Sequence, residues 1–303
     1  MMIASKNPAL QARIVTVLPL SDVRAGSALV WHAGRLLVVQ DDAASVVWID
    51  PLSGQTKRWV LEGTGEQLAK SQKPDFEVAF VGPGQTITIL GSGSSPLRRR
   101  GATLDLDTHA VRIIDHGGLF DAIERALGRE PNLEGGVLWE NQLRLFHRGA
   151  GAQNSAIVEV NLDVLSGAPP RVLDVVSFDL GDIDGVPLHF TDATVIDERI
   201  VYVAVAEDTP NAIEDGPIAG AAMGFIDGRG AMWTTLMEPS GHPSRRKVEG
   251  VTVDPERRTI HAVTDPDDPD KPAELLTIHI DGLQSISAET CDATTAPEQV
   301  RAL

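Results

Sequence analysis

The 303-residue sequence has a single cysteine, Cys291, and no apolar run that approaches the roughly 18 residues needed to span a membrane. One cysteine cannot form an internal disulfide. Nothing around it would lower its pKa, so we expect a bystander and not a nucleophile. The N-terminus lacks a basic segment followed by an apolar block. We therefore predict no signal peptide and a cytoplasmic protein.

Basic residues are also scarce, because 26 Lys and Arg stand against 43 Asp and Glu, giving a net charge of −17. Non-specific binding to nucleic acid or to an anionic membrane needs a basic surface, so we exclude both partners. The acidic excess fits a cation-binding protein, and it equally fits a protein whose Asp and Glu side chains simply keep it soluble. The sequence has no G-x-S-x-G elbow, no H-E-x-x-H and no Walker loop.

What the sequence does have is a repeat. An acid precedes an alternating apolar stretch at Glu77, Glu134, Asp192 and Glu249, with separations of 57, 58 and 57 residues. A weaker copy has Ser27 at the same place, 50 residues before Glu77. Further alternating stretches follow in each copy, for example "QTITILG", "GATLDLD" and "AVRIIDH" after Glu77. Four antiparallel strands per repeat are typical of a β-propeller.

These patterns predict an all-β fold, a five-bladed β-propeller of four-stranded blades. The fifth repeat lacks a fourth strand, which we expect residues 12–20 to supply, so that the N-terminal strand closes the ring and leaves no open edge. Residues 117–130 break the strand pattern with the apolar spacing of one short helix between blades. We predict a single domain over residues 12–283, with tails at 1–11 and 284–303.

In a propeller the first strand of each blade lines the central channel, so Ser27, Glu77, Glu134, Asp192 and Glu249 would converge on one spot. Carboxylates gathered this closely raise one another's pKa and need compensation. A bound cation would supply it, and oxygen ligands in a wide channel favour Ca²⁺, with Mg²⁺ as the alternative. A purely structural ring of acids, neutralised by neighbours such as Lys247, is the competing interpretation.

Basic side chains gather in the segments that would surround the same mouth. They are Lys73, Arg98, Arg99, Arg100, His147, Arg148, His189, Arg245, Arg246 and Lys247. Arginine forks suit a phosphate or carboxylate, so we predict a small anionic ligand. The candidate general base is His147 or a carboxylate of the ring, and Arg148 would help to hold the anion at the catalytic site. Pairing of these residues with acids of the same loops is the alternative.

The segments "KVEGVTVD", "NLEGGVLW" and "DFEVAF" resemble segments of calcium-dependent nucleotidase (apyrase) propellers, and they are similar to segments of esterase-like phytase-domain propellers. The architectural resemblance covers residues 12–283. It implies a central Ca²⁺ held by Ser27, Glu77, Glu134 and Glu249, with Asp192 binding through water. No aromatic side chain is evident at the mouth to stack a nucleotide base.

Three functional hypotheses follow. The first is a metal-dependent hydrolase of a small phosphorylated or anionic substrate. The second is a gluconolactonase-type lactonase, which the blade count opposes. The third is a non-catalytic module that binds a ligand or protein and whose cation is structural. A propeller can host each of them, and the sequence leaves the substrate and the oligomeric state open.

Overall fold

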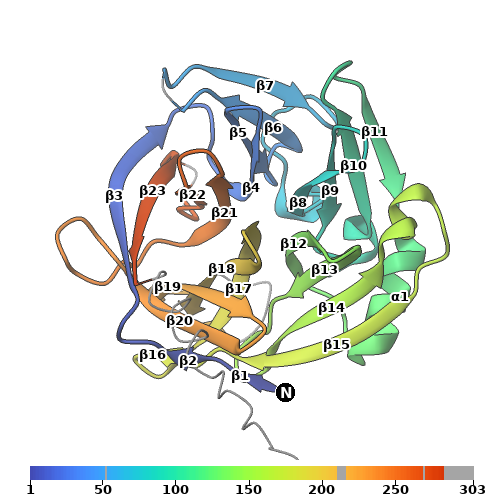
Figure 1. The fold of residues 1–303 in the computed structure, drawn as a ribbon. Helices are drawn as coiled ribbons and strands as arrows, with labels where there is room; N and C mark the ends of the chain where they lie inside the picture. The colour runs from blue at the N-terminus through green and yellow to red at the C-terminus, as the bar shows by residue number, and fades with distance from the viewer. Residues whose placement is uncertain (52, 210–215, 269, 283–303) are drawn as a thin grey trace, which may run out of the picture.

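The structure, a computed structural model, describes residues 1–303 except 52, 210–215, 269 and 283–303. The chain is nearly all-β, and its curved sheets surround a central axis in a propeller-like arrangement (Figure 1). The first antiparallel group contains β4 (Gly26–His32), β5 (Arg35–Gln40), β6 (Ser45–Ile49) and β7 (Thr56–Val60). The second contains β8 (Phe76–Gly82), β9 (Thr86–Gly91), β10 (Arg100–Asp105) and β11 (Val111–Asp115). The third group contains β12 (Leu133–Trp139), β13 (Gln142–His147), β14 (Ser155–Asn161) and β15 (Val172–Asp179). The fourth contains β17 (Val186–Ile196), β18 (Arg199–Glu207), β19 (Ile218–Asp227) and β20 (Gly230–Met237).

The last group joins the two ends of the chain. It contains β21 (Val248–Asp254), β22 (Thr259–Thr264), β23 (Ala273–Asp281) and β3 (Gln11–Leu20). Strand β3 also pairs in parallel with β20, so the fourth and last groups form one continuous sheet. The antiparallel pairing of β3 with β23 confirms the predicted closure by the N-terminal strand. The innermost strands β4, β8, β12, β17 and β21 each contact the next one, and β21 contacts β4, so they form a closed ring.

The first eleven residues differ from the predicted tail. Strand β1 (Met2–Ile3) pairs in parallel with β15, and β2 (Ser5–Lys6) pairs in parallel with β20. These short pairings cover outer strand edges that would otherwise carry open N–H and C=O groups. The predicted tail at 284–303 lies outside the described residues. A further short strand, β16 (Asp182–Ile183), pairs with β17 and was not predicted.

The predicted helix is present as α1 (Gly117–Leu127). It buries Leu119, Phe120 and Ile123 and ends at Gly128, whose left-handed φ of 69° lets its N–H reach the carbonyl oxygen of Glu124. The short 3₁₀ turns are η1 (Lys70–Gln72), η2 (Pro96–Arg98) and η3 (Leu162–Ser166). Among the described residues, no helix is long and apolar enough to cross a membrane.

The core lies between neighbouring groups. Hydrophobic clusters join the facing sides of adjacent sheets around the ring. Between the third and fourth groups, the Phe190 ring meets the rings of Phe146 and Tyr202 edge to face, each with centroids 5.1 Å apart. This sheet-to-sheet packing covers both faces of second strands such as β5 and β18, so almost all of their residues are buried.

Candidate functional site

An acidic cavity of about 440 Å³ opens at one mouth of the axis. Its wall is formed by the beginnings of inner strands and by the loops that precede or follow neighbouring strands. The lining residues are Arg24, Ala25, Ser27, Asp41, Asp42, Gln67, Leu68, Lys73, Asp75, Glu77, Arg98, Asn132, Glu134, Arg148, Lys247, Glu249, Asp265, Asp267 and Asp268. We call this cavity the axial pocket. Acids outnumber bases on its wall, so its field favours a cation over a free anion.

Each inner strand has a β-bulge at the same place near its start. The ladder skips one residue between Gly26 and Ala28, Phe76 and Val78, Leu133 and Gly135, Phe190 and Asp192, and Val248 and Gly250. The skipped residues are Ser27, Glu77, Glu134, Thr191 and Glu249. A bulge leaves its extra residue unpaired and turns its side chain away from the regular alternation. All but Thr191 line the axial pocket.

The fourth position therefore differs from the sequence prediction, because Thr191 and not Asp192 occupies the bulge. The carboxylate of Asp192 accepts hydrogen bonds from the N–H groups of Ala193 at 2.7 Å and Val251 at 2.8 Å, and from the Leu29 amide. Burial raises the pKa of Asp192 well above its usual value, although these amides oppose the shift. Asp192 thus joins strands β17, β21 and β4 and does not line the axial pocket.

The two hydroxyl residues at the bulges link neighbouring inner strands. Ser27 Oγ donates to the carbonyl oxygen of Phe76 at 2.6 Å, and Thr191 Oγ1 donates to that of Val248 at 2.6 Å. In both cases the acceptor directly precedes the bulged glutamate of the next inner strand. Ser27 and Thr191 therefore position Glu77 and Glu249.

A group of three carboxylates stands out on one side of the axial pocket. Asp41, Asp75 and Glu77 each offer an oxygen, and these oxygens lie within 4.8 Å of one another. Lys73 Nζ forms an ion pair with Asp41 Oδ2 at 3.0 Å, and Arg98 Nη1 forms one with Asp75 Oδ2 at 2.8 Å. Asp41 Oδ1 is buried without a hydrogen-bond partner among the described residues. Burial, followed by the charges of Asp75 and Glu134, raises the pKa of Glu77 well above its usual value.

Only Glu77 of this group was predicted as a ligand. Asp41 and Asp75 were not among the site residues predicted from the sequence. A usable signal was the position of each aspartate, just after β5 and just before β8. Asp75 also has a left-handed φ of 55°, which is uncommon for residues other than glycine.

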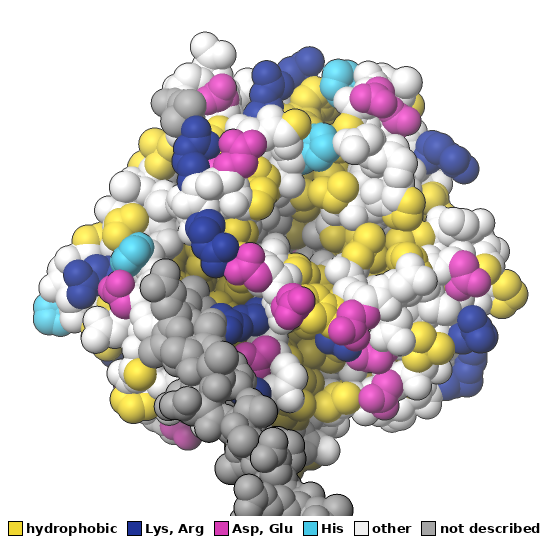
Figure 2. All heavy atoms as spheres, in the orientation of Figure 1, with side chains coloured by type: hydrophobic (Ala, Val, Ile, Leu, Met, Phe, Trp, Pro, Cys, Tyr) yellow, Lys and Arg dark blue, Asp and Glu magenta, His cyan; other side chains and the backbone are white. Residues whose placement is uncertain are grey.

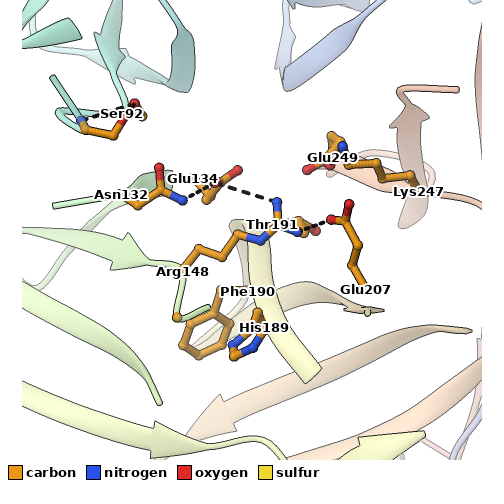
Figure 3. Close-up of polar contacts among 12 residues, drawn as sticks. Ser92, Asn132, Glu134, Arg148, His189, Phe190, Thr191, Glu207, Lys247 and Glu249 are labelled. Carbon is orange, nitrogen blue, oxygen red and sulfur yellow. Dashed lines mark hydrogen bonds and ion pairs between the residues drawn. The ribbon is translucent and has the colours of Figure 1, made fainter. Parts of the chain in front are cut away.

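The other side of the axial pocket carries an ion-pair network (Figure 3). Arg148 pairs with Glu207, and its Nη1 lies 3.8 Å from Glu134 Oε1. Figure 3 shows the carboxylates of Glu134 and Glu249 pointing toward one another from β12 and β21. Asn132 Nδ2 donates to Glu134 Oε1 at 2.8 Å. Burial raises the pKa of Glu134 to about 8, although the Arg148 charge opposes the shift.

The predicted basic residues separate into two sets. Lys73, Arg98, Arg148 and Lys247 line the axial pocket. The others are outside its wall: Arg99 pairs with Asp121 and Glu124 of α1, Arg100 with Glu62, Arg246 with Glu238 and Glu274, and Arg245 is exposed. The alternative of local ion pairs therefore holds for Arg99, Arg100 and Arg246.

The two predicted histidines are also outside the wall of the axial pocket. His147 is buried, and its ring nitrogens face the amide of Asn132 at 2.9 Å and Arg129 Nε at 3.1 Å. His189 is buried beside Ser155 and Gly151. Burial lowers the pKa of His147 to about 3 and that of His189 to about 4, so both stay neutral at physiological pH. His147 is the last residue of β13 and does not line the axial pocket, where the predicted base would act.

The opposite mouth of the axis has a different character. Hydrophobic side chains gather in the central hollow of the face seen in Figure 2. A second cavity, of about 370 Å³, is lined by the later halves of inner strands, including Leu29, Phe80, Val137 and Val195. Asp192 and its amide partners belong to the same inner strands, between the two mouths.

Comparison with solved structures shows a shared fold. The chain is similar to glutaminyl cyclase from Myxococcus xanthus, with 12% identity, a TM-score of 0.53, and coverage of 89% of this chain and 96% of that chain. An α-L-arabinofuranosidase from Podospora anserina has 13% identity, a TM-score of 0.50, and coverage of 91% and 99%. The Malassezia sympodialis allergen Mala s 1 has 9% identity, a TM-score of 0.53, and coverage of 87% and 96%.

These neighbours support the propeller-like architecture, and at such low identity they carry no function to this chain. The resemblance to nucleotidase and phytase-domain propellers stays a prediction. No curated protein matches the sequence. A family model described as a family of unknown function (DUF6929) matches residues 22–280, which spans the chain from just after β3 almost to the end of β23. The chain therefore belongs to the DUF6929 family.

Proposed function

We propose that this protein is a five-bladed β-propeller that works as a divalent-cation-dependent hydrolase of a small anionic substrate. Each antiparallel group would be one blade, with β3 completing the last. The cation would be Ca²⁺, with Mg²⁺ as the alternative. The observation that carries the proposal is the group of Asp41, Asp75 and Glu77 at the axial pocket.

The charges of this group favour a cation. Three carboxylates lie beside only two cationic side chains, Lys73 and Arg98, and each of these occupies a single oxygen. The remaining oxygens include the buried Asp41 Oδ1, which has no hydrogen-bond partner among the described residues. An unpaired buried carboxylate is costly, and a divalent cation would offset that cost. Oxygen donors of this kind suit Ca²⁺ or Mg²⁺.

The cation would supply electrophilic catalysis, by polarising a substrate oxygen and acidifying a water. Glu134 is a well placed proton donor, because it lines the same pocket and its pKa of about 8 keeps it protonated at neutral pH. His147, the general base predicted from the sequence, does not line this pocket and takes no part in this proposal. Arg148 would orient the Glu134 carboxyl, which it approaches at 3.8 Å.

A second function is favoured by one observation. Every basic residue on the wall of the axial pocket already has an acidic partner: Arg24 with Asp42, Lys73 with Asp41, Arg98 with Asp75, Arg148 with Glu207, and Lys247 with Asp267. A non-catalytic module whose cation holds the loops of the mouth together would have this pattern. In the hydrolase, the same pattern means that the anionic group of the substrate is bound chiefly by the cation.

The test is thermal unfolding of EDTA-stripped protein with increasing Ca²⁺ or Mg²⁺, followed by phosphoester and lactone screens. Binding to the native state alone would stabilise it by about 2.7 kcal/mol at a cation concentration of 100 Kd. Glu77→Gln should abolish the rise in Tm, and Glu159→Gln, in the Arg144 ion pair outside the pocket, should preserve it. Absence of any response to either cation in the wild type would refute the proposal.

Turnover separates the two functions. The hydrolase requires cation-dependent activity that Glu134→Gln removes while the rise in Tm persists. A rise in Tm without turnover of any phosphoester or lactone would instead support the non-catalytic module.

A further inference from the structure

The side of the axial pocket opposite the three-carboxylate group has an unbalanced charge of its own. Among the described residues, the ion pairs found for Glu134, Glu207 and Glu249 involve Arg148 and Lys247. Lys247 Nζ lies 2.8 Å from Asp267 Oδ1 and 3.6 Å from Glu249 Oε1. Arg148 pairs with Glu207 and lies 3.8 Å from Glu134 Oε1.

Glu249 is left incompletely paired by this arrangement. The residue is only 5% exposed and lines the axial pocket, and its Oε2 is buried with no hydrogen-bond partner among the described residues. Its carboxylate points across the pocket toward that of Glu134 (Figure 3). A buried carboxylate oxygen without a donor costs free energy unless a ligand supplies one.

The geometry distinguishes between two kinds of cation that could pair with Glu249, a second metal ion and an ammonium group. In the described part of the chain, only Asp41, Asp75 and Glu77 bring three ligand atoms within 4.8 Å of one another. Glu134 and Glu249 do not belong to such a group, so a second metal ion would have fewer than three protein ligands there. A primary ammonium group has three N–H donors and needs separate acceptors at hydrogen-bond distance, which the Glu249 carboxylate and an oxygen of the facing Glu134 carboxyl group provide.

We propose that Glu249 and Glu134 form a subsite for a primary ammonium group, and that the substrate is a small molecule with an ammonium at one end and an anionic group at the other. The ammonium donates to the carboxyl groups of Glu249 and Glu134, and the Glu249 side chain turns to present its unpaired oxygen to the ligand. The placement of the anionic end rests on the proposed cation site. The ammonium subsite stands on the chain's own side chains.

The experiment is calorimetric titration of the full chain with three probes: 2-aminoethyl phosphate, 2-hydroxyethyl phosphate and ethanolamine. With Ca²⁺ present, the aminoethyl compound should bind about tenfold more tightly than the hydroxyethyl compound, the difference expected from one charged hydrogen bond of roughly 1.4 kcal/mol. Glu249→Gln should remove that preference and keep the rise in Tm with Ca²⁺. Glu159→Gln, the control outside the pocket, should keep both.

The outcomes separate the two proposals. Loss of the Ca²⁺ response with retained binding of ethanolamine would overturn the cation site and leave the ammonium subsite standing. Equal affinity of the wild type for the two phosphates would overturn the ammonium subsite, as would failure of both amines to bind. Persistence of the preference in both Glu249→Gln and Glu134→Gln would also overturn it, and the second variant covers the case in which the first does not fold.

Discussion

Replacement of Asp192 by asparagine should destabilise the protein without weakening its response to Ca²⁺. The carboxylate is 1% exposed, and its two oxygens accept from the amides of Ala193 and Val251, with the Leu29 amide as a further donor. Asparagine has the same shape but only one acceptor oxygen. One orientation keeps the Ala193 bond and turns the side-chain NH₂ toward the Val251 N–H, so that two donors face each other.

The magnitude follows from the number of amides left unpaired. One buried amide without an acceptor costs about 1–3 kcal/mol, so we expect Asp192→Asn to lower the free energy of unfolding by about 2 kcal/mol. Asp192→Ala removes the acceptors of all three amides and should cost more. Asp197→Asn is the matched control, because Asp197 lies in the exposed turn after the same strand and pairs with Arg258, with both side chains more than half exposed. It should change stability by less than about 1 kcal/mol.

The assay is urea unfolding of EDTA-stripped protein, repeated with Ca²⁺. Asp192→Asn should shift the midpoint without changing the slope and should retain the stabilisation by Ca²⁺. Unchanged stability without Ca²⁺, together with loss of the Ca²⁺ response, would refute this reasoning. That result would return Asp192 to the ring of cation ligands predicted from the sequence.

Two further predictions concern Glu134 of the axial pocket and the hydroxyl residues at the bulges of the inner strands. Burial raises the pKa of Glu134 from 4.5 to about 8, so its protonated form contributes stability that is fully present below pH 4.5 and is lost as pH rises through 8. Metal-free wild type should therefore lose more stability than Glu134→Gln between these pH values in urea unfolding, and identical pH profiles would contradict the buried proton. Ser27→Ala and Thr191→Val should each cost about 1 kcal/mol in the same assay, because each removes one hydrogen bond between inner strands. Additive losses in the double variant are expected, and a loss confined to one of the two variants would argue against equivalent roles.

The chain's local patterns determined much of the fold. Period-2 alternation and turn residues depend only on near neighbours, so they revealed the groups of antiparallel strands, the helix at Gly117–Leu127 and the need for β3 at the end of the ring. The repeat also identified Ser27, Glu77, Glu134 and Glu249 as residues of one mouth, because equivalent positions of inner strands meet at the axis.

The tertiary structure decided the contents of the site. A bulge moves the side chain that faces the pocket by one residue, and this register exchanged Asp192 for Thr191 although the acidic spacing looked regular. Ion pairs decided which basic side chains reach the mouth. Arg99 pairs with Glu124 of α1, and Arg246 pairs with Glu238 and Glu274, so both lie outside the axial pocket. Asp41 and Asp75 became neighbours only through the packing of separate strands around the axis, since a carboxylate group of this kind depends on distances in space that no local pattern encodes.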